Sequence, residues 1–217
     1  MRTDRELQED VLSALEWEPG VDAATIGVSI QKGIAALHGT ARTFFEKSAA
    51  ERVTRHVYGV RAIANDITVE PDGLAARTDT QIAEAVANAL AWNTAVPIGA
   101  AKATVTHGWV TLNGTVEWQY QKTAAEQAIR HLYGVKGVTN ALLLKPHVSP
   151  TDVKAKIERA FKRSAEVDAA RVKVDAHDGQ VTLSGTVKSL SERDEAERAA
   201  WAAPGVTKVD DRITVAF

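Results

Sequence analysis

The sequence predicts an α+β protein built from three tandem units of about 70 residues, each a three-stranded mixed sheet with two helices on one face. One observation is that the stretch GWVTLNGTV at 108–116 has near-copies at 33–41 and 179–187. A second is that two sets of glycines recur at the same offsets of 75 and 71 residues. These sets are Gly39, Gly114 and Gly185, and Gly59, Gly134 and Gly205. A third is that helical and alternating hydrophobic patterns recur around them in the order α-β-β-α-β.

Each unit opens with an amphipathic helix. In the first unit Leu7, Val11 and Leu15 stand four residues apart, and a Thr, Asp or Ser is available before each such helix as an N-cap. The equivalent apolar residues are Ile82, Val86 and Leu90 in the second unit, and Val153, Ile157 and Phe161 in the third.

Two strands joined by a tight turn follow this helix. The pairs Lys32-Gly33, His107-Gly108 and Asp178-Gly179 are suited to the positive φ angles of a two-residue hairpin. The return strand of the second unit turns Val110 and Leu112 inward, and strict alternation places Gly114 inward too. We therefore expect the missing side chain of this glycine to let a helix backbone cross the sheet closely.

A second helix and a third strand complete each unit. In the second unit the helix carries Ala125, Ala128 and Leu132 on its expected core stripe and ends near Gly134. The third strand, at 138–144, follows a right-handed crossover and is therefore expected to lie parallel to the strand before the helix. The expected domains are 1–72, 76–147 and 149–217.

Composition excludes several classes of protein. A net charge of -2 with 25% charged residues shows no nucleic-acid footprint, and the lack of cysteine removes disulfides and thiolate nucleophiles. No run of about 18 apolar residues predicts a transmembrane segment. The first residues lack the apolar stretch of a secretory signal, so the expected location is cytoplasmic, or periplasmic if a leader was removed.

No catalytic, cofactor or metal pattern stands out. The six histidines form no H-x-x-x-H or H-E-x-x-H pattern. His56 and His131 are equivalent residues at the end of the second helix, where a structural role is expected and a metal or pH-sensing role is the alternative. Asp210 and Asp211 resemble a carboxylate pair but are expected at a strand edge. We therefore expect a non-enzymatic protein without a cofactor or bound metal.

The second unit offers an aromatic candidate for contact with a membrane or a partner. Trp118 and Tyr120, close to Lys122, open its second helix, and only this third of the chain has a net positive charge. Amphipathic rings beside a lysine suit an interface. Three other tryptophans are expected to cover neighbouring units or to pack at helix ends: Trp17, Trp92 and Trp109.

The first helix of the third unit is a basic candidate. Its cations are Lys154, Lys156, Arg159, Lys162 and Arg163. Because its apolar residues occupy the stripe that all three units use for the core, only the charges are free to act. Such attraction to an anionic surface is worth about 1 kcal/mol per residue and weakens with salt.

The repeated pattern resembles the BON family, named for bacterial osmotically inducible and nodulation proteins. The residues that carry the resemblance follow V-x-L-x-G-x-V, here Val110, Leu112, Gly114 and Val116, and are followed by Gly-Val and a V-x-N-x-L strand. The first unit departs from the pattern at Ala35 and Ala41. The resemblance implies a non-enzymatic module of envelope and stress proteins, which contacts anionic phospholipid in several members and holds proteins in others.

Three hypotheses of function follow. The first is a stress-related binding protein that docks on anionic phospholipid or another envelope component. The second is a soluble protein–protein or chaperone-like module, self-association through sheet edges included. The third is a small-ligand or ion sensor acting between units. No nucleic-acid partner is expected.

Overall fold

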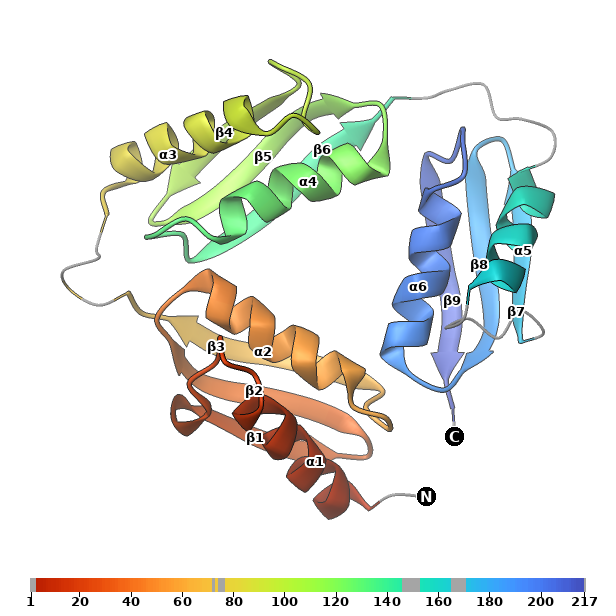
Figure 1. Cartoon of the computed structure of the whole chain (residues 1–217), viewed down its shortest axis with the longest axis horizontal. Helices are drawn as coiled ribbons and strands as arrows, with labels where there is room; N and C mark the ends of the chain where they lie inside the picture. The colour runs from red at the N-terminus through yellow and green to blue at the C-terminus, as the bar shows by residue number, and fades with distance from the viewer. Residues whose placement is uncertain (1–2, 72, 74–76, 146–152, 165–170, 217) are drawn as a thin grey trace.

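The computed structural model describes residues 3–71, 73, 77–145, 153–164 and 171–216. It shows three units in sequence order, each with its own three-stranded sheet covered on one face by two helices (Figure 1). The predicted α+β fold and the repeated order α-β-β-α-β are confirmed.

The units contain equivalent elements. Unit 1 consists of α1 (Asp4–Glu16), a 3-10 turn (Ala23–Thr25), β1 (Ile26–Gln31), β2 (Ile34–Ala41), α2 (Phe44–His56) and β3 (Ala62–Val69). Unit 2 consists of α3 (Asp79–Trp92), β4 (Ala101–Thr106), β5 (Trp109–Val116), α4 (Gln119–Arg130) and β6 (Gly137–Leu144). Unit 3 consists of α5 (Val153–Arg163), β7 (Val172–His177), β8 (Gln180–Val187), α6 (Leu190–Trp201) and β9 (Lys208–Val215).

The sheet topology follows the prediction. The central strands β2, β5 and β8 each pair antiparallel with the strand before them and parallel with the strand after the second helix. Val110 and Leu112 of β5 have no exposed surface, and the first-helix residues Ile82 and Val86 pack in the same core. The apolar periodicity therefore identified the core side of both the first helix and the hairpin.

The hairpin turn is held by the first helix. In unit 2, His107 and Gly108 have φ angles of 51° and 80°, as a two-residue turn with left-handed residues requires. Their amide groups donate hydrogen bonds of 2.7 and 2.8 Å to the Asp79 carboxylate at the start of α3. These two bonds lower the pKa of Asp79, because they favour its ionised form. Asp4 makes the same contacts with the turn of unit 1.

The glycine near the end of the central strand has a different role from the predicted one. Gly39 and Gly114 are exposed and Gly185 is partly exposed, so this position does not face the core. Gly114 has a φ of 138°, and a Cβ atom there would overlap the carbonyl oxygen of Ala100, just before β4. Equivalent carbonyl groups lie against Gly39 and Gly185. The prediction of a helix crossing over this glycine is therefore wrong, because the close neighbour is hairpin backbone.

The other repeated glycine stands past the end of the second helix, as predicted. Gly59, Gly134 and Gly205, which follow the ends of α2, α4 and α6, have φ angles of 108°, 87° and 85°. These angles lie in or beside the left-handed region, where a glycine is favoured as the chain leaves a helix.

The second helix is turned relative to the predicted stripe. In α4 the buried residues are Gln121, Ala125 and Ile129, whereas Ala128 and Leu132 are only half-buried. The Gln121 side-chain oxygen accepts hydrogen bonds of 2.9 and 3.0 Å from two amide groups at the start of the helix. Buried Glu46 and Glu192 accept from equivalent loops in the other units. This buried polar position was not predicted from the sequence.

The second helices bring the units together. In Figure 1, α2, α4 and α6 face one another in the middle, and α1, α3 and α5 lie at the periphery. Arg55 on α2 forms a 3.2 Å ion pair with Asp194 on α6, and Phe45 on α2 stacks on His131 with ring centroids 4.6 Å apart. Buried residues of units 1 and 3 form one continuous cluster, whereas unit 2 has a cluster of its own.

Candidate functional site

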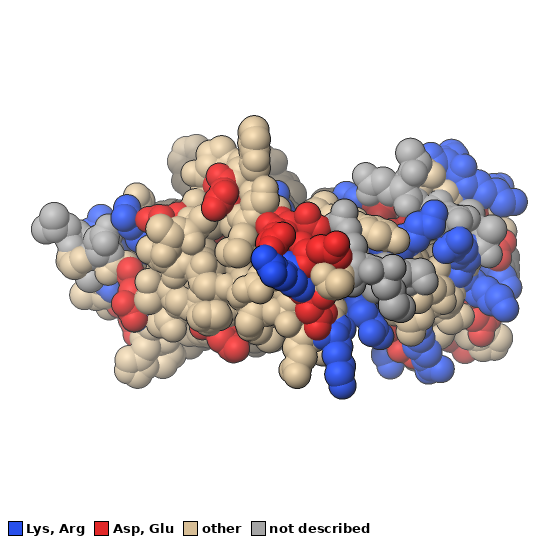
Figure 2. All heavy atoms as spheres, turned by 90° about the horizontal axis from the view of Figure 1, so that it is seen from below, with Lys and Arg blue, Asp and Glu red and all other residues tan. Residues whose placement is uncertain are grey.

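The peripheral helix α5 carries the predicted basic surface. Val153, Ile157 and Phe161 are buried with exposures of 4% or less, so the helix uses its whole apolar stripe for the core of unit 3. The cations Lys154, Arg159, Lys162 and Arg163 are exposed, and Lys156 is half-buried. Glu158 is the one acidic residue of the helix. Figure 2 shows Lys and Arg side chains gathered at the end of the molecule that unit 3 forms.

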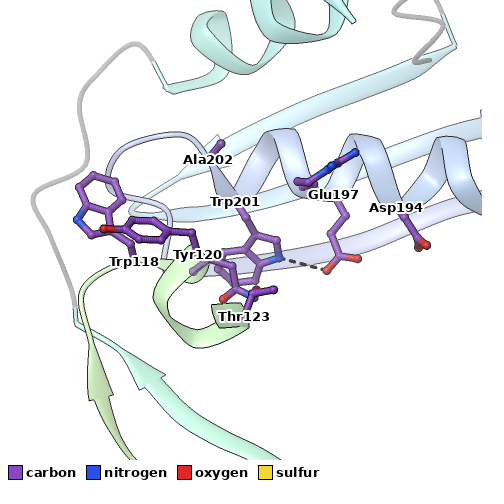
Figure 3. A pocket seen from close by; sticks show the side chains of 9 residues that line it. Trp118, Tyr120, Thr123, Asp194, Glu197, Trp201 and Ala202 are labelled. Carbon is purple, nitrogen blue, oxygen red and sulfur yellow. Dashed lines mark hydrogen bonds between the residues drawn. The ribbon is translucent and has the colours of Figure 1, made fainter. Parts of the chain in front are cut away.

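The predicted aromatic residues line a cleft between units 2 and 3 (Figure 3). Its volume is about 760 Å³. Trp118, Gln119, Tyr120 and Thr123 form the α4 wall, and Asp194, Glu197, Arg198, Trp201 and Ala202 form the α6 wall. The indole N–H of Trp201 donates a 3.2 Å hydrogen bond to Glu197, and Tyr120 is 59% exposed. The cleft therefore combines three aromatic side chains with two carboxylates and the guanidinium group of Arg198.

Trp201 was not among the predicted site residues. It stands at the repeat position of Arg55 and Arg130 in the other units. A large aromatic residue in place of a charged one, on a helix whose other residues are mostly charged or small, was the signal that could have identified it.

Lys122 makes a contact within its own unit. Its Nζ donates a 2.7 Å hydrogen bond to the carbonyl oxygen of Leu142, so it ties α4 to β6 within unit 2. Lys47 makes the same 2.7 Å contact with Ile67 in unit 1. This recurrence indicates a structural role for the lysine, and the assignment of Lys122 to a membrane or partner contact stays a prediction.

The remaining predicted residues fall on two separate surfaces. The cleft lies between α4 and α6, and in Figure 1 α6 stands between α4 and α5. Trp118 and Tyr120 therefore do not share a face with the cations of α5, and the two groups must be tested separately.

Three other tryptophans do not have the predicted surroundings. Trp17 and Trp92, at the ends of α1 and α3, are 84% and 86% exposed, so the expected packing role is wrong. Trp109 lies over Gly137 of its own unit, and its indole N–H donates a 2.8 Å hydrogen bond to Thr139. It covers a neighbouring strand rather than a neighbouring unit.

His56 and the aspartate pair have structural surroundings. The Nδ1 atom of His56 lies 2.7 Å from the carbonyl oxygen of Arg52 at the end of α2. Asp210 pairs with Arg212, and Asp211 pairs with Arg193 at 2.6 Å. Within the described ranges no group of three or more His, Asp or Glu side chains is placed to hold a metal ion.

A charged network lies where α2 meets α6. Burial alone would raise the pKa of Glu51, but hydrogen bonds from Asn65 and Arg55 and the charges of Arg55 and Arg130 hold that pKa below its usual value. Burial would lower the pKa of Arg55, but Glu51 and Asp194 raise it. Both groups therefore keep their charges at the contact between units.

The fold and its surfaces define a tandem-repeat module protein whose candidate sites lie on helix surfaces and between units. The BON domain family matches residues 3–71, 78–146 and 149–216, and the chain belongs to this family. Within the described part of the chain, no helix has both the length and the apolar run needed to cross a bilayer.

One curated relative is osmotically-inducible protein Y of Escherichia coli (strain K12). It is 36% identical over 111 residues, which are 46% of this chain and 54% of the relative. The chain thus spans about half the length of the curated relative it matches.

Two solved structures of CdsD, a structural protein of the type III secretion system of Chlamydia trachomatis, are similar at 14% identity. The first has a TM-score of 0.27 and covers 97% of this chain and 92% of CdsD; the second, its C-terminal domain, has a TM-score of 0.26 with 100% of each chain covered. These scores are too low to support a shared arrangement.

Proposed function

We propose that the protein is a non-enzymatic, stress-associated envelope protein that docks on anionic phospholipid surfaces through α5. The observation that carries this proposal is the peripheral position of α5, with Lys154, Arg159, Lys162 and Arg163 exposed and its apolar stripe buried. Membership of the BON family and the similarity to an osmotically inducible protein support the stress and envelope association. The compartment stays a prediction from the sequence: cytoplasmic, or periplasmic if a leader was removed.

The mode of docking follows from the burial pattern. Because Val153, Ile157 and Phe161 are held in the core of unit 3, α5 has no free apolar face to insert between lipids. Binding is therefore electrostatic, with about 1 kcal/mol for each cation close to an anionic surface. It is weakened by salt, since the screening length falls from about 10 Å at 0.1 M to about 3 Å at 1 M.

Vesicle co-sedimentation tests this proposal. We expect the full chain to bind vesicles that contain phosphatidylglycerol at low salt, to leave them at high salt, and to ignore phosphatidylcholine vesicles. Lys162→Glu with Arg163→Glu should abolish binding. The matched control, Lys173→Glu with Lys208→Glu, changes the charge by the same amount at exposed strand positions of unit 3. This control variant should keep most of the vesicle binding.

The proposal fails if the unaltered chain does not bind anionic vesicles at low salt. It also fails if the control pair loses as much binding as the α5 pair, because the attraction would then belong to the overall charge rather than to this helix.

A second candidate function, recognition of a protein partner, is favoured by the aromatic cleft between α4 and α6. Its rings and its carboxylates, Asp194 and Glu197, suit a peptide with a basic side chain beside an apolar one. Tyr120→Ala removes an exposed ring and should weaken binding of such a peptide, chosen from a display library, without changing vesicle binding. If no library peptide depends on Tyr120, this candidate is rejected.

A further inference from the structure

A small polar pocket lies between α2 of unit 1 and the C-terminal end of α4 of unit 2, and no residue of α5 lines it. Its volume is about 250 Å³. Phe45, Ser48, Ala49 and Arg52 of α2 line one side, and Gln127, Arg130 and His131 line the other. No carboxylate is part of this lining. The pocket therefore presents two guanidinium groups, an imidazole, a hydroxyl and an amide.

The two arginines have hydrogen-bond donors to spare. A guanidinium group carries five N–H donors. The Arg52 guanidinium donates to Glu18 at 2.8 Å, and the Arg130 guanidinium donates to Glu126 at 2.7 Å. Both carboxylates stand outside the pocket lining, so they hold the arginines in position without closing it.

One of these donors is buried without an acceptor. The Nε of Arg130 is inaccessible to solvent and has no hydrogen-bond partner among the described residues. A buried donor without an acceptor costs free energy, and the cost is larger for a charged group. An anion that entered the pocket, with a small shift of this side chain, would supply the missing acceptor.

The neighbouring side chains complete a set of donors. Phe45 stacks on His131 with ring centroids 4.6 Å apart, which fixes the imidazole between the two units. Ser48 and Gln127 each offer a neutral donor on opposite sides of the pocket. Tetrahedral oxyanions take several donors from different directions, and paired guanidinium groups bind them strongly.

We propose that this pocket binds a phosphate group, either as a free phosphate or as the phosphate of a small molecule or lipid head group. A divalent cation does not fit, because the lining offers no carboxylate ligand. Since the donors come from both α2 and α4, the bound phosphate holds units 1 and 2 together. Phosphate binding should therefore raise the melting temperature of the full chain.

Titration of the full chain with inorganic phosphate, at constant ionic strength with chloride as the reference anion, tests the proposal by calorimetry and by thermal shift. Arg130→Gln and Arg52→Gln should each weaken phosphate binding by about tenfold or more, because each removes charge-assisted donors. Arg55→Gln is the matched control. Arg55 occupies the equivalent repeat position and pairs with Glu51 as Arg130 pairs with Glu126, but it does not line the pocket.

A second arm distinguishes the source of the phosphate. Glycerol phosphate in solution is compared with vesicles that contain phosphatidic acid, using the chain with Lys162→Glu and Arg163→Glu so that α5 does not contribute. Binding of either probe that depends on Arg130 supports the proposal and identifies the source. If inorganic phosphate, glycerol phosphate and the vesicles all fail to bind, or bind equally well to Arg130→Gln while circular dichroism shows it folded, the proposal is overturned.

Discussion

Gly114→Ala introduces one methyl group at the tightest point of the unit 2 hairpin. The φ of 138° at this residue lies in a region that an L-residue occupies at a cost of about 1–3 kcal/mol. The new carbon would also overlap the Ala100 carbonyl oxygen, which is backbone and cannot rotate away. That oxygen accepts a 3.1 Å hydrogen bond from Thr115, and loss of this bond adds about 1 kcal/mol.

The expected loss in the free energy of unfolding of unit 2 is therefore about 3 kcal/mol. For a unit of this size 1 kcal/mol corresponds to about 4–8 °C, so the melting temperature of unit 2 should fall by on the order of 15 °C. Scanning calorimetry of the full chain measures this shift, and hydrogen exchange of the β4 and β5 amides assigns it to unit 2.

Gly99→Ala is the matched control. Gly99 also has a positive φ, 77°, but no atom lies within 4 Å of the position that its Cβ would take. Its replacement by alanine should lower the free energy of unfolding by only about 1 kcal/mol, which is the cost of placing an L-residue in a left-handed conformation. Equal losses for the two variants would refute the backbone contact as the reason for Gly114.

Three further predictions concern single contacts. Lys122→Met should lower the free energy of unfolding of unit 2 by about 1 kcal/mol in urea, because the bond to the Leu142 carbonyl is lost, and should leave vesicle binding unchanged; the reverse pattern would return Lys122 to the contact surface. Asp79 has a lowered pKa, so its contribution to stability is present above its unfolded pKa of about 3.9 and is lost as the pH falls through the lower folded value. In Asp79→Asn, urea midpoints between about pH 5 and 2 should therefore vary less with pH, and an unchanged profile would exclude a stabilising role for the two turn hydrogen bonds to Asp79. A double-mutant cycle with Arg55→Met and Asp194→Asn should give a coupling energy below about 1 kcal/mol, because these side chains are 33% and 46% exposed; a value of several kcal/mol would contradict this estimate.

The sequence was sufficient for the architecture of each unit, because local patterns determine it. The spacing of Leu7, Val11 and Leu15 and the left-handed turn pairs depend only on residues close in the chain. Gly114 was misplaced because the alternation rule assumes a regular strand, whereas its φ of 138° makes this one residue depart from the alternation, which resumes at buried Val116. The helix stripe was misplaced because Gln121 is buried despite its polar side chain, since it accepts backbone hydrogen bonds.

The candidate sites were only partly predictable. The basic surface of α5 could be predicted because it depends only on the apolar stripe and the cations of a single helix. This helix lies on the periphery, where most of these charges are exposed. The aromatic cleft and the arginine pocket each need two helices from different units, and no local pattern says which helices meet. Trp201 and Arg130 therefore gained their candidate roles only from the packing of α6 and α2 against α4.

The meeting of the second helices in the middle of the molecule limits how the three copies can diverge. In each unit the second helix packs against different neighbouring helices, and its residues differ accordingly. One repeat position is Phe45 in unit 1, Tyr120 in unit 2 and Ser191 in unit 3, and another is His56, His131 and Ala202. The three units thus share one fold but differ in the residues that contact the other units. A chain with its repeats in another order would keep three sheets and lose the Phe45–His131 stack and the Arg55–Asp194 pair, so linear order is itself part of the assembly.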